Sequence, residues 1–395
     1  MKNFPDEAHS SSIELSQEAF ENNIDYIRTR VAPNTELGVV MKGNAYGHGI
    51  EALTELAIAE NITTFFVFSA YEAYRVKCSC QNKPVRVIIM GYIHEDSIAW
   101  AIEEDIELFV FDLQRLNRVI FEAKRLDKPA KIHLEVETGM NRTGFERDNI
   151  KGVCKAILSG GDTIQVKGLC THFAGAEEVA NYVRIHKQHK SLKWWRTQLS
   201  KLDIRVAQTH AVCSAGLLNY PEAQYDLVRV GIMMYGFWPS LETRILQLKE
   251  KADPLKRLLR WTSTIMSIKQ VKLGDYIGYG SAFLATSHMT IATVPVGYAY
   301  GFSRSLSNNG RVLVSGKPAQ VIGIVNMNLL IINISDLPEV KVKDEVVLIG
   351  RQGDQEISVA SFSEMSQQLN YEMLTRLPAD IPRIIKYKQE KTVTA

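Results

Sequence analysis

The pattern that decides the fold begins with residues 37–49, which read LGVVMKGNAYGHG. Residues 37–42 form a short run that is apolar on both faces, as in a strand buried within a parallel sheet. A glycine-rich turn follows, and Gly49–Glu60 then shows the spacing of a helix. A buried strand followed at once by a helix is the repeating unit of α/β proteins.

The same unit recurs as far as residue 236. The eight predicted strands are Leu37–Lys42, Thr64–Phe68, Val85–Tyr92, Ile106–Phe111, Lys131–Glu137, Ile164–His172, Arg205–Val212 and Leu227–Met233. Longer helical patterns lie between them, for example at Glu178–Leu202. Eight repeats of strand and helix favour a (β/α)8 barrel of the TIM type over the alternative, a doubly wound open sheet.

The pattern changes beyond Pro239. Residues 257–350 carry alternating strand patterns separated by turn sequences such as Ser307–Gly310 and Ser315–Pro318, and a longer helical pattern returns only at Ser361–Leu369. We therefore predict two domains, a barrel over residues 1–245 and a mainly β C-terminal domain over residues 246–395.

The composition is that of an ordinary globular protein and excludes several function classes. The 395 residues carry a net charge of +2, so bulk charge does not indicate a nucleic-acid or membrane-surface partner. Five cysteines at scattered spacing do not form a disulfide framework, and no apolar run has the length of a membrane span. We expect a cytoplasmic protein.

Polar side chains at strand ends are the candidates for chemistry, because a barrel of this kind places its catalytic groups at the carboxyl ends of the strands. That rule selects Lys42, Arg142, His172, Ser214, Arg229 and Gly231. Lys42 is the most unusual, since burying an ammonium group is costly unless it is paired or neutralised. A Schiff base with an aldehyde cofactor would neutralise it. The structural alternative is a lysine that extends out of the barrel mouth.

Motifs spread over the whole chain carry a family resemblance. The lysine stretch at 39–49 resembles a motif of the alanine racemases, which are fold-type III pyridoxal-phosphate enzymes. Seven more motifs resemble that family and occur in its order: residues 136–144, 171–174, Ser214 with 228–236, 277–280, 296–299, 325–327 and 370–372. A single motif of this length is weak evidence, whereas eight in order across both predicted domains are strong evidence.

The resemblance implies a racemase with two bases, because the substrate proton must leave one face of Cα and return on the other. Lys42 would hold pyridoxal 5'-phosphate as a Schiff base and act as one base after exchange with the substrate. Tyr279 would be the second base. In the family this tyrosine comes from the partner subunit, which implies a homodimer. Without the resemblance, a core tyrosine in a β domain is the simpler interpretation of Tyr279.

The resemblance also implies which residues bind the cofactor. Arg229 would lie against the pyridine nitrogen and donate to it, because a guanidinium stays protonated. The ring would then stay largely neutral, which disfavours side reactions such as transamination. His172 would stack on the ring. The phosphate would be bound by Ser214, Tyr46, Tyr371 and the backbone N–H groups of Gly231 and Ile232.

Arg142 and the backbone N–H of Met327 would bind the substrate carboxylate, and Tyr298 would line the entrance. We expect no metal site, since no second ligand follows His172 at a suitable spacing. Taken singly, these residues have plainer interpretations. Ser214 could be a helix N-cap, His172 a structural histidine and Arg229 an ion-pair residue.

Three positions depart from the common family pattern. Glu135 stands where many members carry a carbamylated lysine, so we expect no carbamate and a carboxylate of the same sign beside Arg142. Asn328 and Tyr300 each replace an aspartate near the substrate or the entrance. These departures affect the choice of substrate and leave the cofactor and the two bases in place.

Four hypotheses follow. The first is racemisation of L-alanine to D-alanine, which supplies the peptide of the cell wall (peptidoglycan). The second is a racemase of broader or shifted specificity, acting on serine, lysine or arginine. The third is a pyridoxal-phosphate decarboxylase of the same fold, against which Arg229 argues, because a carboxylate is expected at its place there. The fourth is a non-catalytic pyridoxal-phosphate carrier, which would resemble the barrel half only.

Overall fold

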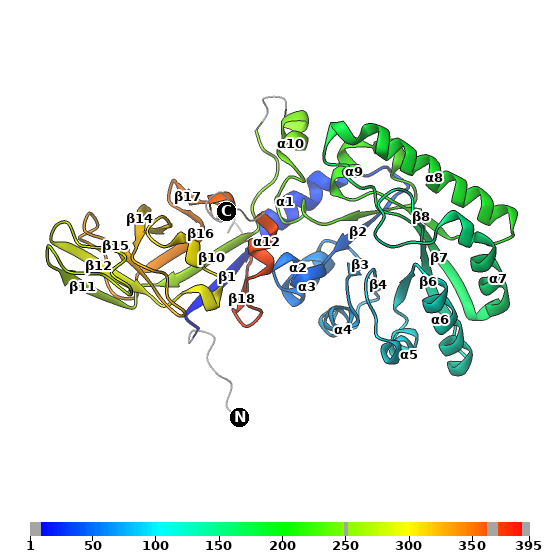
Figure 1. Ribbon diagram of the computed structural model, residues 1–395, viewed down its shortest axis with the longest axis horizontal. Helices are drawn as coiled ribbons and strands as arrows, with labels where there is room; N and C mark the ends of the chain where they lie inside the picture. Colours follow the sequence, from blue (N-terminus) through cyan, green and yellow to red (C-terminus); the bar gives the residue numbers. More distant parts are fainter. Residues whose placement is uncertain (1–8, 249–251, 362–369, 389–395) are drawn as a thin grey trace, which may run out of the picture. The chain divides into compact units, whose positions relative to one another are not determined.

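The structure, a computed structural model, describes residues 9–248, 252–361 and 370–388, and the chain forms two compact units (Figure 1). The barrel unit comprises residues 19–42 and 53–256, and the β unit comprises residues 1–18, 43–52 and 257–395. Most of the predicted helix at Ser361–Leu369 lies outside the described residues.

The barrel unit is built on eight parallel strands, which confirms the predicted (β/α)8 barrel. The strands are β2 (Glu36–Val40), β3 (Thr64–Val67), β4 (Arg86–Ile89), β5 (Glu107–Val110), β6 (Ala130–Glu135), β7 (Ile164–Cys170), β8 (Gln208–His210) and β9 (Leu227–Val230). They pair in the order β8-β7-β6-β5-β4-β3-β2-β9. The edge strands β8 and β9 approach each other, because the Asp226 N–H donates to the Thr209 carbonyl over 3.1 Å. The barrel is therefore nearly closed.

The barrel strands are buried on both faces because helices cover the outside and side chains fill the inside. Every residue of β3, β5 and β9 is buried. The helices α4–α8 lie around the outside of the strands (Figure 1). The helices of this part of the chain are α1 (Gln17–Arg28), α3 (Ile50–Ala59), α4 (Ala70–Ser79), α5 (Glu95–Glu103), α6 (Leu113–Leu126), α7 (Ile150–Gly160), α8 (Tyr182–Lys201), α9 (Ser214–Asn219) and α10 (Leu241–Leu248).

The β unit is a separate, mostly β domain, as predicted. Its sheet runs in the order β11-β12-β15-β14-β13-β16-β10-β1-β18, and β17 pairs with β16. The strands are β1 (Ser11–Ser16), β10 (Leu259–Thr264), β11 (Ser267–Val271), β12 (Met289–Val294), β13 (Arg311–Val314), β14 (Lys317–Ile322), β15 (Leu330–Asn333), β16 (Glu345–Gln352), β17 (Gln355–Ile357) and β18 (Arg383–Lys386). A short helix, α12 (Asn370–Thr375), precedes β18.

The N-terminal strand β1 belongs to this sheet, although the sequence pattern assigned residues 1–245 to the barrel domain. It pairs antiparallel with β10 and parallel with β18, so that Ile13 lies opposite Trp261 and Arg383. Ile13 and Leu15 are fully buried there. Long-range pairing of this kind leaves no local signal in the sequence, and the boundary between residues 245 and 246 stays a prediction.

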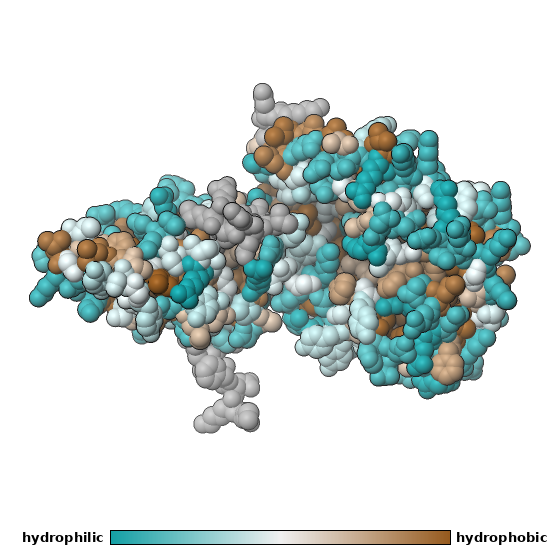
Figure 2. Space-filling model, in the orientation of Figure 1, coloured by the Kyte–Doolittle hydropathy of each residue, from teal (hydrophilic) through white to brown (hydrophobic). Residues whose placement is uncertain are grey.

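The surface in view is mainly hydrophilic, with a hydrophobic area over α10 (Figure 2). Leu241, Ile245 and Leu246 of that helix are exposed. Within the described ranges, no helix combines the length and the apolar character that crossing a bilayer requires.

Candidate active site

Lys42 follows the end of β2 at the mouth of the barrel. The strand is held there by the Tyr235 hydroxyl, which donates to the Val40 carbonyl over 3.0 Å, and by the Met41 N–H, which donates to the Phe66 carbonyl over 2.8 Å. Lys42 keeps contact with solvent, while desolvation by the surrounding protein and the nearby charge of Arg142 lower the pKa of its ammonium group. A lowered pKa favours the neutral amine, the form that can act as nucleophile or base.

Arg229 lies in β9, and only 5% of it is exposed. Its guanidinium donates to the Thr171 carbonyl over 2.8 Å, to the His210 carbonyl over 3.1 Å and to Nδ1 of the His210 ring. Within the described part of the chain, its hydrogen-bond acceptors are all neutral. Desolvation lowers the pKa of this group, yet a guanidinium remains protonated in proteins. Arg229 thus carries a buried positive charge with no carboxylate bonded to it.

Arg142 lies in a loop that Glu137 organises. The Glu137 carboxylate accepts hydrogen bonds from the backbone N–H groups of Gly139, Met140 and Asn141. Next to this loop, the buried Glu135 accepts a hydrogen bond from the Thr143 hydroxyl over 3.0 Å. Burial raises the pKa of the Glu135 carboxyl group, and the Thr143 hydrogen bond and the charge of Arg142 act in the opposite direction. The charge of Arg142 thus favours the ionised form of Glu135, which is consistent with the predicted pairing of the two residues.

His172 follows β7 in the same region. Burial, followed by the charges of Arg229 and Arg142, lowers the pKa of His172 to about 3. The ring is therefore neutral over the physiological pH range. Its backbone carbonyl accepts a hydrogen bond from the Gln188 amide over 3.0 Å, which fixes the chain at this point. A neutral, positioned imidazole can lie against a flat ring without adding charge.

Ser214 joins two adjacent loops. It opens α9, but Cys213 occupies the N-cap position and the Ser214 hydroxyl accepts a hydrogen bond from the Gly231 N–H over 3.1 Å. The N-cap interpretation of Ser214 is thus not what the structure shows. The hydroxyl and the neighbouring backbone N–H groups of Gly231 and Ile232 supply the kind of donors that bind a phosphate.

The β unit brings together a second group of predicted residues. Tyr279 stands between Gly278 (φ 75°) and Gly280 (φ 69°), whose left-handed backbone presents a side chain that is 71% exposed. A hollow of about 440 Å³ is lined by Tyr279, Tyr298, Met327 and Asn328 among others. A backbone hydrogen bond links two residues of its lining, because the Tyr298 N–H donates to the Asn326 carbonyl over 3.0 Å.

Two further predicted residues, Tyr46 and Tyr371, lie near each other in the β unit. Their ring centroids are 6.4 Å apart in an edge-to-face arrangement. Residues 43–45, just before Tyr46, have left-handed backbone angles, with φ between 53° and 63°. The glycine-rich turn of the sequence is thus an unusual backbone turn that directly follows Lys42.

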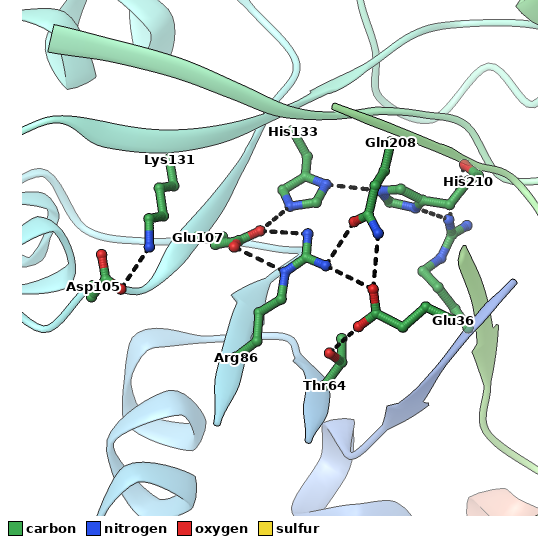
Figure 3. Close-up of polar contacts among 10 residues, drawn as sticks. Glu36, Thr64, Arg86, Asp105, Glu107, Lys131, His133, Gln208 and His210 are labelled. Carbon is green, nitrogen blue, oxygen red and sulfur yellow. Dashed lines mark hydrogen bonds and ion pairs between the residues drawn. The ribbon is translucent and has the colours of Figure 1, made fainter. Parts of the chain in front are cut away.

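A chain of polar side chains through the interior of the barrel was not predicted (Figure 3). It runs from Arg229 and His210 through His133 and Glu107 to Arg86. Polar residues inside otherwise apolar strands were the available signal, because buried polar groups need partners. The partners themselves depend on strand register, which the sequence pattern does not give.

The charges at the barrel mouth fit an anionic ligand. Lys42, Arg142 and Arg229 interact electrostatically with one another, and each lowers the pKa of His172. The carboxyl group of Glu135 interacts with the charges of Arg142 and Arg229, and burial raises its own pKa. The neutral acceptors around Arg229 leave its charge available to a ligand atom with a lone pair. An amine, a hydroxyl and backbone N–H groups complete a donor set suited to a phosphorylated aldehyde.

Known proteins resemble the chain over both units. Residues 15–239 match the family profile described as alanine racemase, N-terminal domain, and residues 258–385 match that of the alanine racemase, C-terminal domain. The alanine racemase of Leptospira interrogans is 35% identical over 390 residues, which cover 96% of each chain. That of Desulforamulus reducens is 34% identical, over 94% of this chain and 97% of its own.

Solved structures show the same architecture. The alanine racemase of Clostridium difficile 630 superposes with a TM-score of 0.88 at 27% identity, over 97% of both chains. That of Bacillus anthracis, solved with bound L-Ala-P, gives a TM-score of 0.87 at 31% identity, over 97% of this chain and 96% of its own. A Bartonella henselae alanine racemase with covalently bound pyridoxal phosphate shares the fold, with a TM-score of 0.80 at 23% identity over 96% of this chain and 100% of its own.

Proposed function

This chain belongs to the alanine racemase family, an isomerase family, and from that membership we propose that it converts L-alanine to D-alanine with pyridoxal phosphate at the barrel mouth. The observation that carries the proposal is Arg229, a buried cation that interacts with Lys42 and has no carboxylate hydrogen-bonded to it among the described residues. Bound pyridoxal phosphate supplies an electron sink that acidifies the Cα–H bond of the substrate. Arg229 donates to the ring nitrogen rather than protonating it, which favours proton return over other reactions.

Two bases move the proton. Lys42 would hold the cofactor, and its amine would exchange a proton with one face of Cα. Tyr279, supplied by the partner subunit of a homodimer, exchanges a proton with the other face. The exposure of Tyr279 in the isolated chain and its presentation between two left-handed glycines support this role. A core tyrosine would be buried instead.

The remaining residues bind and orient. His172 stacks on the ring, Arg142 and the Met327 N–H bind the carboxylate of the substrate, and Tyr298 lines the entrance. The phosphate is assigned to Ser214, Gly231, Ile232, Tyr46 and Tyr371. Glu135 provides the negative charge beside Arg142, and we propose that this position carries no carbamate, because a glutamate offers no amine to carbamylate.

Alanine is the proposed substrate. The D-alanine would be used in the peptide of the cell wall, and the enzyme would act in the cytoplasm. Asn328 in the lining of the hollow is the observation that favours the second candidate, a broader specificity that includes serine, lysine or arginine. An amide there removes a negative charge that the common pattern places near the substrate. The proposed place of Arg229 beside the ring argues against the decarboxylase hypothesis, for which a carboxylate is expected there.

Exchange of the α-proton tests the reaction directly. Purified protein loaded with pyridoxal phosphate is incubated with single L-amino acids in deuterated water, and loss of Cα–H is followed by NMR together with chiral analysis. We expect alanine to exchange fastest and to end as a racemate. Faster racemisation of serine, lysine or arginine would select the second candidate. Release of carbon dioxide, or no exchange despite bound cofactor, would contradict racemisation altogether.

Substitution of Tyr279 tests the second base. Tyr279→Phe should lower turnover by about 10²–10⁴-fold in at least one direction, the usual contribution of a positioned acid–base group, with the cofactor still bound. Tyr276→Phe is a matched control, since Tyr276 is a similarly exposed tyrosine of the same segment. Wild-type rates in both directions for Tyr279→Phe would refute the two-base assignment.

A further inference from the structure

The interior of the barrel contains a continuous hydrogen-bonded chain that the proposed chemistry does not use (Figure 3). From Arg229 it passes to His210, then from Nε2 of His210 to Nδ1 of His133 over 2.8 Å, and from Nε2 of His133 to the Glu107 carboxylate over 2.6 Å. Arg86 ends the chain with two hydrogen bonds to Glu107, each of 2.9 Å.

The beginning of the chain fixes the position of every proton in it. A guanidinium can only donate, so Nδ1 of His210 must accept from Arg229 and the ring proton of His210 lies on Nε2. Nδ1 of His133 accepts that proton's hydrogen bond, and Nε2 of His133 therefore donates to Glu107. Both rings are neutral, since burial lowers the pKa of each. Every hydrogen bond from Arg229 to Glu107 is therefore donated in the same direction along the chain.

The far end of the chain is anchored by charge. Burial raises the pKa of the Glu107 carboxyl group, but hydrogen bonds from His133 and Arg86 outweigh burial and lower it to about 2. Arg86 also donates to Glu36 over 3.2 Å and to the Gln208 side chain over 2.7 Å. Glu107 is therefore ionised and held in place, so it can fix the ring of His133.

The fold makes room for this arrangement. His133 in β6 lies opposite Gly168 in β7, and a Cβ atom at Gly168 would lie 2.0 Å from Nδ1 of His133. The His133 ring stacks on Phe109 at a centroid distance of 5.5 Å, and Phe66 lies 5.8 Å from the His210 ring. Both imidazoles are fully buried between strands and aromatic rings. Neither ring can rotate without losing a hydrogen bond to its partner.

We propose that His133, Glu107 and Arg86 are positioning residues that act through His210 to hold the Arg229 guanidinium in the orientation that meets the cofactor ring. This inference deepens the proposed function and rests on it for the identity of the ligand. The chain orients a charge whose hydrogen-bond acceptors in the described ranges are all neutral, which explains how Arg229 can be rigid and still available to a ligand. A salt bridge would also fix Arg229 but would neutralise it.

Three variants separate orientation from mere packing. His133→Leu removes both hydrogen bonds of the ring. His133→Gln keeps an acceptor toward His210 and a donor toward Glu107 and should rescue the effect. Gly168→Ala removes no polar group and displaces the His133 ring. Lys131→Gln is the control, because Lys131 is two residues from His133 on β6 but pairs with Asp105, outside the chain.

The first measurement needs no cofactor. In protein with ¹⁵N-labelled histidine and arginine, we expect two neutral rings protonated on Nε2 and a slowly rotating Arg229 guanidinium. In His133→Leu and Gly168→Ala the Arg229 signals should broaden, while His133→Gln and Lys131→Gln retain them. Protonation of His210 on Nδ1, or a rigid Arg229 in folded His133→Leu, would overturn the proposal even if the protein binds no pyridoxal phosphate.

The second measurement uses pyridoxal phosphate as the probe. His133→Leu should weaken its binding about tenfold and shift its absorbance, the scale of loss seen when an outer partner of a binding group is removed. His133→Gln should restore both values. Unchanged affinity and absorbance in a folded His133→Leu protein would overturn the proposal. A wild-type protein that takes up no cofactor would instead refute the proposed function, with the labelled-arginine result still deciding the role of the chain.

Discussion

Two arginines lie inside the same barrel and have opposite surroundings. Arg86, at the start of β4, bonds twice to the Glu107 carboxylate and once to Glu36. Arg229, in β9, bonds only to neutral acceptors within the described ranges. The first charge is neutralised where it stands, and the second is held in place with its charge intact.

This difference matches the division of labour in a (β/α)8 barrel, in which the carboxyl ends of the strands carry catalysis and the amino ends carry stability. The Arg86 side chain is 21% exposed and that of Glu107 only 4%, so breaking their pair leaves an uncompensated charge at a largely buried site and costs stability. Removing a cation from the mouth relieves a concentration of like charges. The largest loss should therefore be in activity for substitutions at the mouth and in stability for substitutions at the amino end.

The largest effect is expected at the mouth. Lys42→Ala should abolish covalent cofactor binding, seen as loss of its absorbance band, and should reduce racemisation to background, because no other group forms the link. Stability should hardly change, since the lost charge lies near Arg142 and Arg229. Lys131→Gln, at the other end, should keep both band and activity. Borohydride reduction and peptide mass spectrometry of the wild type locate the lysine, and a label on another lysine would contradict the assignment.

For Glu107→Gln, the largest loss is expected in stability. This change leaves the charge of Arg86 without its bidentate partner, and the free energy of unfolding should fall by about 3–5 kcal/mol. The covalent band should persist, because Lys42 is intact. Urea denaturation measures the loss, and Glu107→Gln/Arg86→Gln, which removes both charges, should recover part of it. Full wild-type stability of the single variant would show that the pair at the amino end is not structural.

Stability should fall in two stages as the pH is lowered, first through His172 at the mouth and then through Glu107 at the amino end. The folded pKa of His172 is lowered from 6.5 to about 3, so the unfolded chain binds the proton first, and stability is complete above pH 6.5 and falls as the pH drops toward 3. For Glu107, lowered from 4.5 to about 2, the loss begins only below pH 4.5. One pKa unit is worth about 1.4 kcal/mol, so the two shifts correspond to roughly 5 kcal/mol for His172 and roughly 3 kcal/mol for Glu107 across their windows.

Urea unfolding between pH 7.5 and pH 3 measures the free energy of unfolding across these pH ranges. His172→Gln should reduce the loss of stability between pH 6.5 and 4.5. Part of that loss should remain, because burial also lowers the pKa values of the His133 and His210 rings. Glu107→Gln should flatten only the part below pH 4.5. The same curve for both variants would mean that the two ends do not titrate separately.

The sequence predicted the parts of this comparison that depend on local pattern. Apolar strands, helical spacing and the residues at strand ends follow from side-chain period and from turn chemistry, and these patterns are enough to predict Lys42, His172 and Arg229 at the barrel mouth. The joining of β1 to β10 and β18 was not predicted, because pairing across about 250 and about 370 residues has no local trace in the sequence.

The chain from Arg229 to Arg86 was missed for a related reason. His133 and His210 come from strands β6 and β8, and the intervening pairing of β6 with β7 shifts its register between Ile132 and His133. A sequence shows that each buried histidine needs a partner but not which one. The role of Gly168 could not be predicted from the sequence either, because it depends on the neighbouring His133 ring that the glycine accommodates.

The smallest effect is expected for a second ion pair at the amino end. Lys131 and Asp105 are 2.6 Å apart, closer than Arg86 and Glu107, but their side chains are 26% and 58% exposed, against 4% for Glu107. Water solvates both charges, so Lys131→Gln should lower the free energy of unfolding by less than about 1 kcal/mol. The same urea experiment measures it beside Glu107→Gln. A loss as large as that of Glu107→Gln would mean that distance rather than burial sets the strength of these pairs, and the contrast between the two ends would then need another cause.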